Sequence, residues 1–123
     1  TPAMSKRILV IDDAPDVRLV LKEMLKQLGF SEITSVATGG EAIDLLKLRE
    51  FDLVILDIEL PDINGKQLLN RISISNNCPV VMCSAHNTVD NVQATWEMGA
   101  KGFLTKPIEL KKLTHLLKKI GTL

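Results

Sequence analysis

The sequence predicts an α/β fold in which five parallel strands form one sheet with helices on both of its faces. Short apolar runs, each about five residues long, alternate with longer stretches whose apolar residues recur every three or four positions. This alternation is typical of strand–helix–strand units, in which a helix connects two parallel strands. Such crossovers are almost always right-handed, and this handedness divides the helices between the two faces of the sheet.

Length, composition and charge limit the classes of protein to which the chain can belong. Its 123 residues, 46% of them apolar, suffice for one domain with a hydrophobic core, so we expect a single domain over residues 1–123. Residues 1–5 are expected to be a disordered or cloning-derived start. The chain has 15 Lys and Arg residues and 15 Asp and Glu residues, and this zero net charge argues against general nucleic-acid binding.

The sequence gives no indication of secretion or of membrane insertion. No apolar stretch approaches the ~18 residues of a membrane span, and no charged start followed by an apolar core indicates a signal peptide. Cys78 and Cys83 match neither a redox pair nor a zinc pattern, and Cys83 is expected to be a buried hydrophobe within a strand. Reduced thiols fit a cytoplasmic protein, which is the location we expect.

Three strands and two helices are expected in the N-terminal half of the chain. The strands are predicted at residues 6–11, 32–37 and 52–58. The first helix is predicted over 15–28, because Pro15 suits a first helical turn and Gly29 suits a helix end. A turn at residues 38–40 is expected to lead into a second helix that ends near Arg49.

The C-terminal half is predicted to add two strands and three helices. A loop that holds Pro61, Asn64 and Gly65 is expected to lead into a short helix over 66–72. The remaining strands and helices are predicted at residues 79–84, 88–98, 102–105 and 109–120. Four lysines near the C-terminus form either a local basic patch or, more simply, a solvated helix face: Lys111, Lys112, Lys118 and Lys119.

Charged residues stand where three separate apolar strands end. Asp12 and Asp13 follow the apolar run of the first strand, Asp57 follows that of the third, and Lys106 follows that of the fifth. In an open parallel sheet the carboxyl ends of the strands gather at one edge, where ligands bind. Carboxylates that face one another repel unless a cation lies among them, and hard oxygen ligands of this kind suit Mg²⁺. Since a lysine beside them suits a phosphate, we expect the function at this edge.

The residue types at this edge are suited to phosphoryl transfer. A carboxylate such as Asp57 can attack phosphorus, and a bound Mg²⁺ neutralises the charge on the attacking and transferred groups. By itself Asp57 could be a simple turn residue, but Asp12, Asp13 and Lys106 at matching strand ends favour the functional interpretation. Ser84, at the end of the fourth strand, could hydrogen-bond a phosphoryl oxygen, cap a helix or act as a hydrolase nucleophile, although no G-x-S-x-G pattern is present.

Taken together, these motifs resemble the receiver domain of bacterial two-component response regulators, in the CheY-like superfamily. The resemblance covers the chain from about Lys6 onward in the order and spacing of that family. The matching stretches are ILVIDD at 8–13, LDIELPDING at 56–65, Ser84 with Ala85, and GAKGFLTKP at 99–107. The resemblance implies a flavodoxin-like, doubly wound (βα)5 fold with strand order 2-1-3-4-5.

The resemblance also implies a role for each residue at the edge. Asp57 would be the phosphoacceptor, and Lys106 would contact the phosphoryl group. The metal, Mg²⁺ or Mn²⁺, would be held by Asp12, Asp13, Asp57 and the main-chain carbonyl of Glu59. Ser84 would be the switch hydroxyl and Phe103 the switch aromatic. Glu59 and His86 occupy positions that tune the lifetime of the phosphoryl group in this family, although His86 is otherwise expected to be a solvent-facing loop residue.

The partners implied by the resemblance are other proteins. The phosphoryl donor would be a sensor histidine kinase or a phosphotransfer protein, docked near the helix that starts at Pro15 and the loop at Pro107. Output would use the face formed by residues 88–98, 102–105 and 109–120, where Trp96 is either half-buried or an interface anchor. The downstream output domain or protein is not identified, a phosphorylation-dependent dimer is a family possibility, and direct binding of nucleic acid or membrane is not expected. Such a domain is not an enzyme toward other substrates, since it catalyses only its own phosphorylation and dephosphorylation.

Two other functions are compatible with parts of the sequence. A Mg²⁺-dependent phosphohydrolase of the haloacid dehalogenase type also uses an aspartate nucleophile at a strand end, but it usually carries a second aspartate where this chain has Glu59. A non-phosphorylated interaction module could share the fold, although it would not need the complete set of charged residues. A nucleotide-binding protein is disfavoured because no G-x-G-x-x-G follows the first strand.

Overall fold

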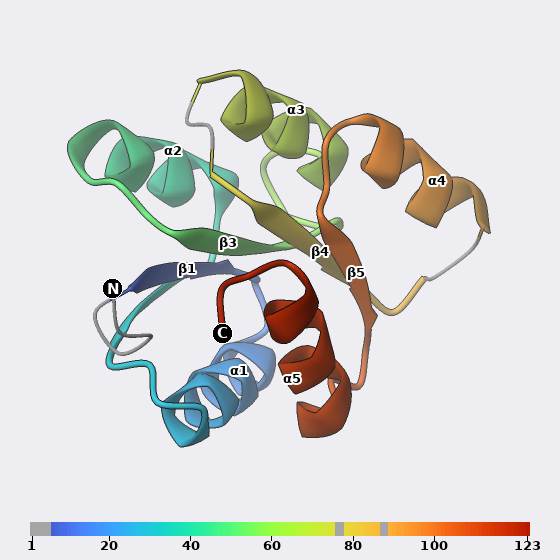
Figure 1. Cartoon of the computed structure of the whole chain (residues 1–123). Coiled ribbons are helices and arrows are strands. Elements are labelled where there is room, and N and C mark those ends of the chain that lie inside the picture. The colour runs from blue at the N-terminus through green and yellow to red at the C-terminus, as the bar shows by residue number, and fades with distance from the viewer. Residues whose placement is uncertain (1–5, 76–77, 87–88) are drawn as a thin grey trace.

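A single parallel sheet forms the centre of the molecule. The computed structural model describes residues 6–75, 78–86 and 89–123, and within them five strands pair in the order β2-β1-β3-β4-β5 (Figure 1). The strands are β1 (Arg7–Ile11), β2 (Glu32–Val36), β3 (Leu53–Asp57), β4 (Val80–Ser84) and β5 (Gly102–Thr105). The helices are α1 (Pro15–Gln27), α2 (Gly39–Leu48), α3 (Gly65–Ser75), α4 (Val89–Glu97) and α5 (Leu110–Lys119). The predicted α/β class and strand order are confirmed, while residues 1–5 lie outside the described part.

The helices form one layer on each face of the sheet. Helices α1 and α5 cover one face and α2, α3 and α4 cover the other (Figure 1). The three inner strands β1, β3 and β4 are buried almost throughout, whereas the residues of the edge strand β2 are exposed or half-buried except for Val36 at its end, which is buried. This burial explains why the inner strands are continuous apolar runs in the sequence. None of the helices in the described ranges has the length and apolar character that crossing a membrane would require.

Each face of the sheet has its own hydrophobic core. On one face, α2 and α3 contribute Ala42, Leu46, Leu68, Leu69 and Ile72. On the other, α1 and α5 contribute Leu21, Leu25, Leu113 and Leu117. These residues recur at three- and four-residue steps, so the helical period in the sequence corresponds to the faces that pack on the sheet.

The clearest difference from the predicted boundaries is the length of α3. The sequence predicts a helix over 66–72, whereas α3 spans Gly65–Ser75. No proline or glycine interrupts the chain between Ile72 and Ser75, so the helix continues after its last buried residue. Ser73 and Ser75 are polar and Ile74 is exposed, so these positions do not continue the apolar period, and the sequence pattern underestimates the length of the helix.

Hydrogen bonds attach the loop between β3 and α3 to the residue after β3 and to the start of α2. The Gly65 amide donates to the Ile58 carbonyl at 2.8 Å, and Glu59 and Asn64 form an isolated antiparallel bridge across the loop. The Asp62 carboxylate accepts hydrogen bonds of 2.9 Å each from two amides at the start of α2, those of Gly39 and Gly40. These donors hold the pKa of Asp62 below its ordinary value, as expected for a carboxylate at a helix N-terminus.

Gly65 should be intolerant of any side chain. A Cβ atom there would lie 2.5 Å from the Asp57 carbonyl oxygen and 2.5 Å from the Ile58 Cα, and backbone atoms cannot easily move away. We expect Gly65→Ala to lower the free energy of unfolding by about 1–3 kcal/mol, the usual cost of overpacking. Urea unfolding measures the loss.

Gly40→Ala is the matched control for that substitution. Its Cβ would lie 3.3 Å from Asp62 Oδ2, the end of a side chain that can shift, so the destabilisation should be smaller. Equal losses in the two variants would contradict the proposed tight packing at Gly65.

Candidate functional site

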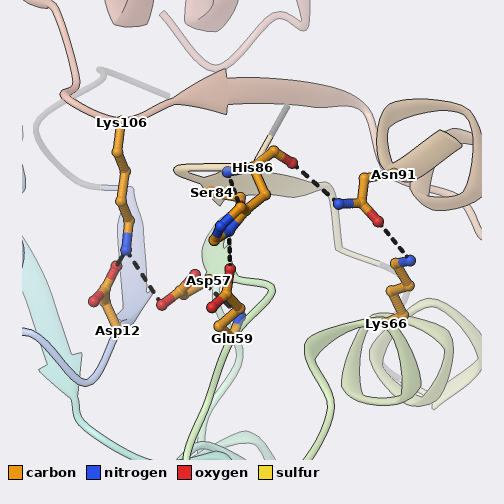
Figure 2. A network of polar contacts seen from close by, with 8 residues as sticks. All are labelled: Asp12, Asp57, Glu59, Lys66, Ser84, His86, Asn91 and Lys106. Atoms are coloured by element: carbon orange, nitrogen blue, oxygen red, sulfur yellow. Dashed lines mark hydrogen bonds and ion pairs between the residues drawn. The ribbon is translucent and has the colours of Figure 1, made fainter. Parts of the chain in front are cut away.

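The carboxyl ends of three strands bring two aspartates and a lysine into contact. Asp12 follows β1, Asp57 ends β3 and Lys106 follows β5. Lys106 Nζ lies 2.8 Å from Asp12 Oδ2 and 3.2 Å from Asp57 Oδ2, so one ammonium group bridges both carboxylates (Figure 2). All three side chains lie at least four-fifths out of solvent contact, which makes their mutual attraction stronger than that of a surface ion pair.

Burial and charge shift the proton affinities of the two central groups. Burial, reinforced by the negative charge of Asp12, raises the pKa of Asp57, although the Glu59 amide and Lys106 act in the opposite direction. The Glu59 amide donates to Asp57 Oδ1 at 3.1 Å. For Lys106, burial lowers the pKa, but the hydrogen bond to Asp12 and the charges of Asp12 and Asp57 outweigh it and raise the pKa overall. The lysine is therefore held in its charged form.

The donor set at this edge fits a small divalent cation. Within the described residues, Asp12, Asp13 and Asp57 each offer a carboxylate oxygen, and these atoms lie within 4.8 Å of one another. Asp12 and Asp57 are buried while Asp13 is exposed, so the cluster opens to solvent on one side. An all-oxygen set of this kind suits Mg²⁺, and Glu59, the fourth predicted ligand, lies in the loop directly after β3.

The first of these aspartates is fixed by contacts outside the cluster. Asp12 Oδ1 accepts a hydrogen bond from the Ala14 amide at 2.9 Å, and the Asp12 carbonyl accepts one from Arg18 Nη1 at 2.7 Å. Arg18 lies one turn into α1 and is not among the site residues predicted from the sequence. Because it contacts a main-chain oxygen, no motif of acidic or catalytic residues would have identified it.

Ser84 and Phe103 lie on the two strands beyond Asp57. Ser84 is fully buried at the end of β4, and its Oγ accepts a hydrogen bond from the His86 amide at 2.9 Å. Phe103, on the edge strand β5, is partly buried against the core on the α2–α3 side and pairs with Met82. Cys83 lies in the core beside this site, where burial raises the pKa of its thiol to about 12, so it is a buried hydrophobe as predicted.

The structure adds three contacts that sequence reasoning did not predict. The His86 ring contacts the Glu59 carboxylate, although both side chains are largely exposed. Asn91 Nδ2 donates to the His86 carbonyl at 3.1 Å, and Lys66 Nζ donates to Asn91 Oδ1 at 2.8 Å (Figure 2). His86 is thus solvent-facing, as predicted, but not isolated. Glu59 and His86 are brought together because they follow the paired strands β3 and β4, and Lys66 and Asn91 because they lie in the first turns of α3 and α4.

This arrangement of five strands, an acidic cluster and a bridging lysine defines the class of protein. The family model of the response regulator receiver domain matches residues 8–118. The chain therefore belongs to the response regulator receiver family, in the CheY-like superfamily, and its signalling role in two-component systems follows from that membership.

Individual relatives agree with this assignment. The chain is 31% identical over 119 residues to the chemotaxis protein CheY of Thermotoga maritima, covering 96% of this chain and 99% of that protein. It is 35% identical over 119 residues to the two-component response regulator ARR11 of Arabidopsis thaliana, covering 92% of this chain but 23% of that protein. A two-component response regulator from Clostridium difficile has a structure with a TM-score of 0.89 at 29% identity, covering 94% of this chain and 95% of that chain.

The raised pKa of Asp57 leads to a prediction about stability. A carboxyl whose pKa is higher in the folded than in the unfolded protein favours folding below its unfolded pKa, and that contribution is lost as the pH rises through the folded value. In the absence of divalent cations, Asp57→Asn should therefore unfold at a higher urea concentration than the parent at pH 7. The difference should shrink as the pH falls toward 4.

Asp44→Asn, at an exposed position on α2, controls for the loss of one carboxylate. If Asp57→Asn were no more stable than the parent at pH 7, the attraction of Lys106 would outweigh the burial of Asp57, and the argument would fail.

Proposed function

We propose that the chain accepts a phosphoryl group on Asp57 from a phosphohistidine of a sensor histidine kinase or a phosphotransfer protein. The observation that carries the proposal is the contact of one partly buried ammonium, that of Lys106, with the carboxylates of both Asp12 and Asp57. The edge of the sheet then holds a nucleophile, Asp57, and a cation for the incoming phosphoryl oxygens, Lys106. It also holds an acidic cluster that could bind a metal ion. The expected cytoplasmic location belongs to the same proposal.

The chemical step can be followed from the residues themselves. A carboxylate oxygen of Asp57 attacks phosphorus, the bond from phosphorus to the donor imidazole nitrogen breaks, and its electron pair stays on that nitrogen. The product is an aspartyl phosphate on Asp57. Lys106, which already lies beside Asp57 Oδ2, then faces the transferred oxygens and offsets their charge.

A divalent cation, Mg²⁺ or Mn²⁺, fits the acidic side of this site. The residues proposed to hold it are Asp12, Asp13, Asp57 and the main-chain carbonyl of Glu59. When bound, the ion neutralises negative charge on the carboxylates and on the phosphoryl group. It would thereby offset the repulsion between Asp12 and Asp57, in addition to the offset that Lys106 provides.

The response to phosphorylation is proposed to pass through Ser84 and Phe103. A phosphoryl group adds about −1.5 to −2 charge and three strong acceptor oxygens beside a buried hydroxyl. Ser84 can donate to one of these oxygens, and the space that it leaves can admit the half-buried Phe103 ring. The shift in packing would then alter the surface on which β5 lies.

Partner binding is proposed for two surfaces. The output surface consists of α4, β5 and α5, and Trp96 is 60% exposed there, which favours an interface anchor over the alternative of a half-buried side chain. The donor-docking surface consists of the start of α1 and the loop at Pro107, and the exposed apolar residues Leu19 and Val20 on α1 support it. The downstream partner is not specified by either surface, and dimerisation through the output surface is one form that the response could take.

Intact mass measured after incubation with Mg²⁺ and acetyl phosphate tests the acceptor. We expect one added phosphoryl group in the parent, none in Asp57→Asn, and none in the parent when Mg²⁺ is removed with a chelator. A phosphohistidine-bearing phosphotransfer protein replaces acetyl phosphate if the parent is unreactive toward the small donor.

Other outcomes would favour the alternative functions. Steady release of phosphate without an adduct would favour a hydrolase of the haloacid dehalogenase type. An unmodified parent with both donors would favour a non-phosphorylated interaction module on the same fold.

The role of Phe103 can be tested separately from acceptance of the phosphoryl group. We expect Phe103→Ala to be phosphorylated normally but to lose most of the phosphorylation-dependent change in partner affinity, since a methyl group cannot occupy the space of the ring. Calorimetric titration with the cognate output partner measures that change. Trp96→Ala is the control, because it should weaken binding in both states alike. If phosphorylation changed the partner affinity of Phe103→Ala as much as that of the parent, the aromatic switch would be ruled out.

A further inference from the structure

A chain of polar contacts connects the phosphoacceptor loop to helices α3 and α4. It begins at Glu59, two residues after Asp57, passes through His86 and Asn91, and ends at Lys66 (Figure 2). The contacts join four segments: the β3–α3 loop, the segment after β4, the first turn of α3 and the first turn of α4. None of these contacts is a hydrogen bond between strands of the sheet. Because they lie beside Asp57, we ask what they do for the reaction there.

His86 is held at three of its polar groups. Its amide donates to Ser84 Oγ at 2.9 Å, its ring contacts Glu59, and its carbonyl accepts from Asn91 Nδ2 at 3.1 Å. The position of the Ser84 hydroxyl is therefore coupled to the position of His86. If Ser84 moves toward a new acceptor on Asp57, the hydrogen bond from the His86 amide must break or His86 must move with it.

The contacts along this chain of residues differ in strength. The side chains of His86 and Glu59 are 65% and 60% exposed, and exposed pairs of this kind contribute little. The bond from Lys66 Nζ to Asn91 Oδ1 is partly buried, has a charged donor and measures 2.8 Å, which is typical of the stronger hydrogen bonds. Lys66 thus fixes the Asn91 amide, and the opposite end of that amide restrains the His86 carbonyl.

We propose that Lys66 and Asn91 are positioning residues for the reaction at Asp57, which hold His86 and Ser84 in the unphosphorylated arrangement and slow phosphoryl acceptance. The inference rests on the proposed function, because it concerns the rate of that reaction. Acceptance should be fastest when Ser84 is free to reach the incoming oxygens. The apparent rate is then low because only a small fraction of the molecules has Ser84 in that arrangement. Loss of the Lys66–Asn91 bond increases this fraction.

The test is the rate of phosphorylation of the full chain by acetyl phosphate and Mg²⁺, followed by intact mass. We expect Lys66→Met to react about threefold to tenfold faster than the parent, the range that one net hydrogen bond can supply. Asn91→Ala should be faster to a similar extent, although it leaves the charge of the protein unchanged. Lys66→Arg, which keeps a donor and the charge, should restore a rate close to that of the parent.

A matched control separates this effect from a simple change in charge. Lys47, exposed on α2, is substituted in Lys47→Met and should leave the rate unchanged. Urea unfolding of all the variants separates the rate effect from a loss of fold, since a purely structural role would lower stability without accelerating the reaction.

A double-mutant cycle tests whether Lys66 and Asn91 act as one link. The double variant Lys66→Met with Asn91→Ala should react no faster than either single variant, because both remove the same bond. Rates that multiply in the double variant, or single variants that react at the rate of the parent or more slowly, would overturn the inference. A parent that accepts no phosphoryl group from acetyl phosphate or a phosphohistidine protein would instead refute the proposed function on which it rests.

Discussion

The organisation of this edge of the sheet depends on one ammonium group. Lys106 extends from the end of the edge strand β5, across β4, to the carboxylates of Asp57 at the end of β3 and of Asp12 directly after β1. Without it, two buried carboxylates would face each other with no charge to offset their repulsion, and an uncompensated buried charge is strongly destabilising. The same arrangement supports the proposal of a cation and a phosphoryl group at this site, since each would change the balance of charge among Asp12, Asp57 and Lys106.

This charge balance requires a rigid support for Asp57. The support is the β3–α3 loop. At its end, Gly65 packs against the backbone of Asp57 and Ile58, and the carboxylate of Asp62 attaches the loop to the start of α2. Because Asp62 accepts from two amides of the same helix start, it restrains the loop in more than one direction. The region around Asp57 is thus attached to α2 on one side and, through Asn91 and Lys66, to α3 and α4 on the other.

The contacts beside Asp57 differ in how readily they can change. The main-chain contacts at Gly65 are backbone to backbone and are surrounded by core residues. The contacts of His86 involve exposed or partly exposed side chains, so they can be broken without exposing the core. A site with rigid support on one side and separable contacts on the other can respond to an added charge without unfolding, as a two-state switch requires.

The sequence by itself determined the fold class, the strand order through a family resemblance, and the placement of the charged residues at the ends of β1, β3 and β5. It could do so because buried strands are continuous apolar runs and because parallel strands end at one edge. The length of α3 and the contacts of Arg18, Lys66 and Asn91 were decided only by the tertiary structure. These contacts join polar residues on separate elements, and polar residues carry no periodic signal of their partners. Their pairing depends on how the helices pack side by side on the sheet, which local sequence does not encode.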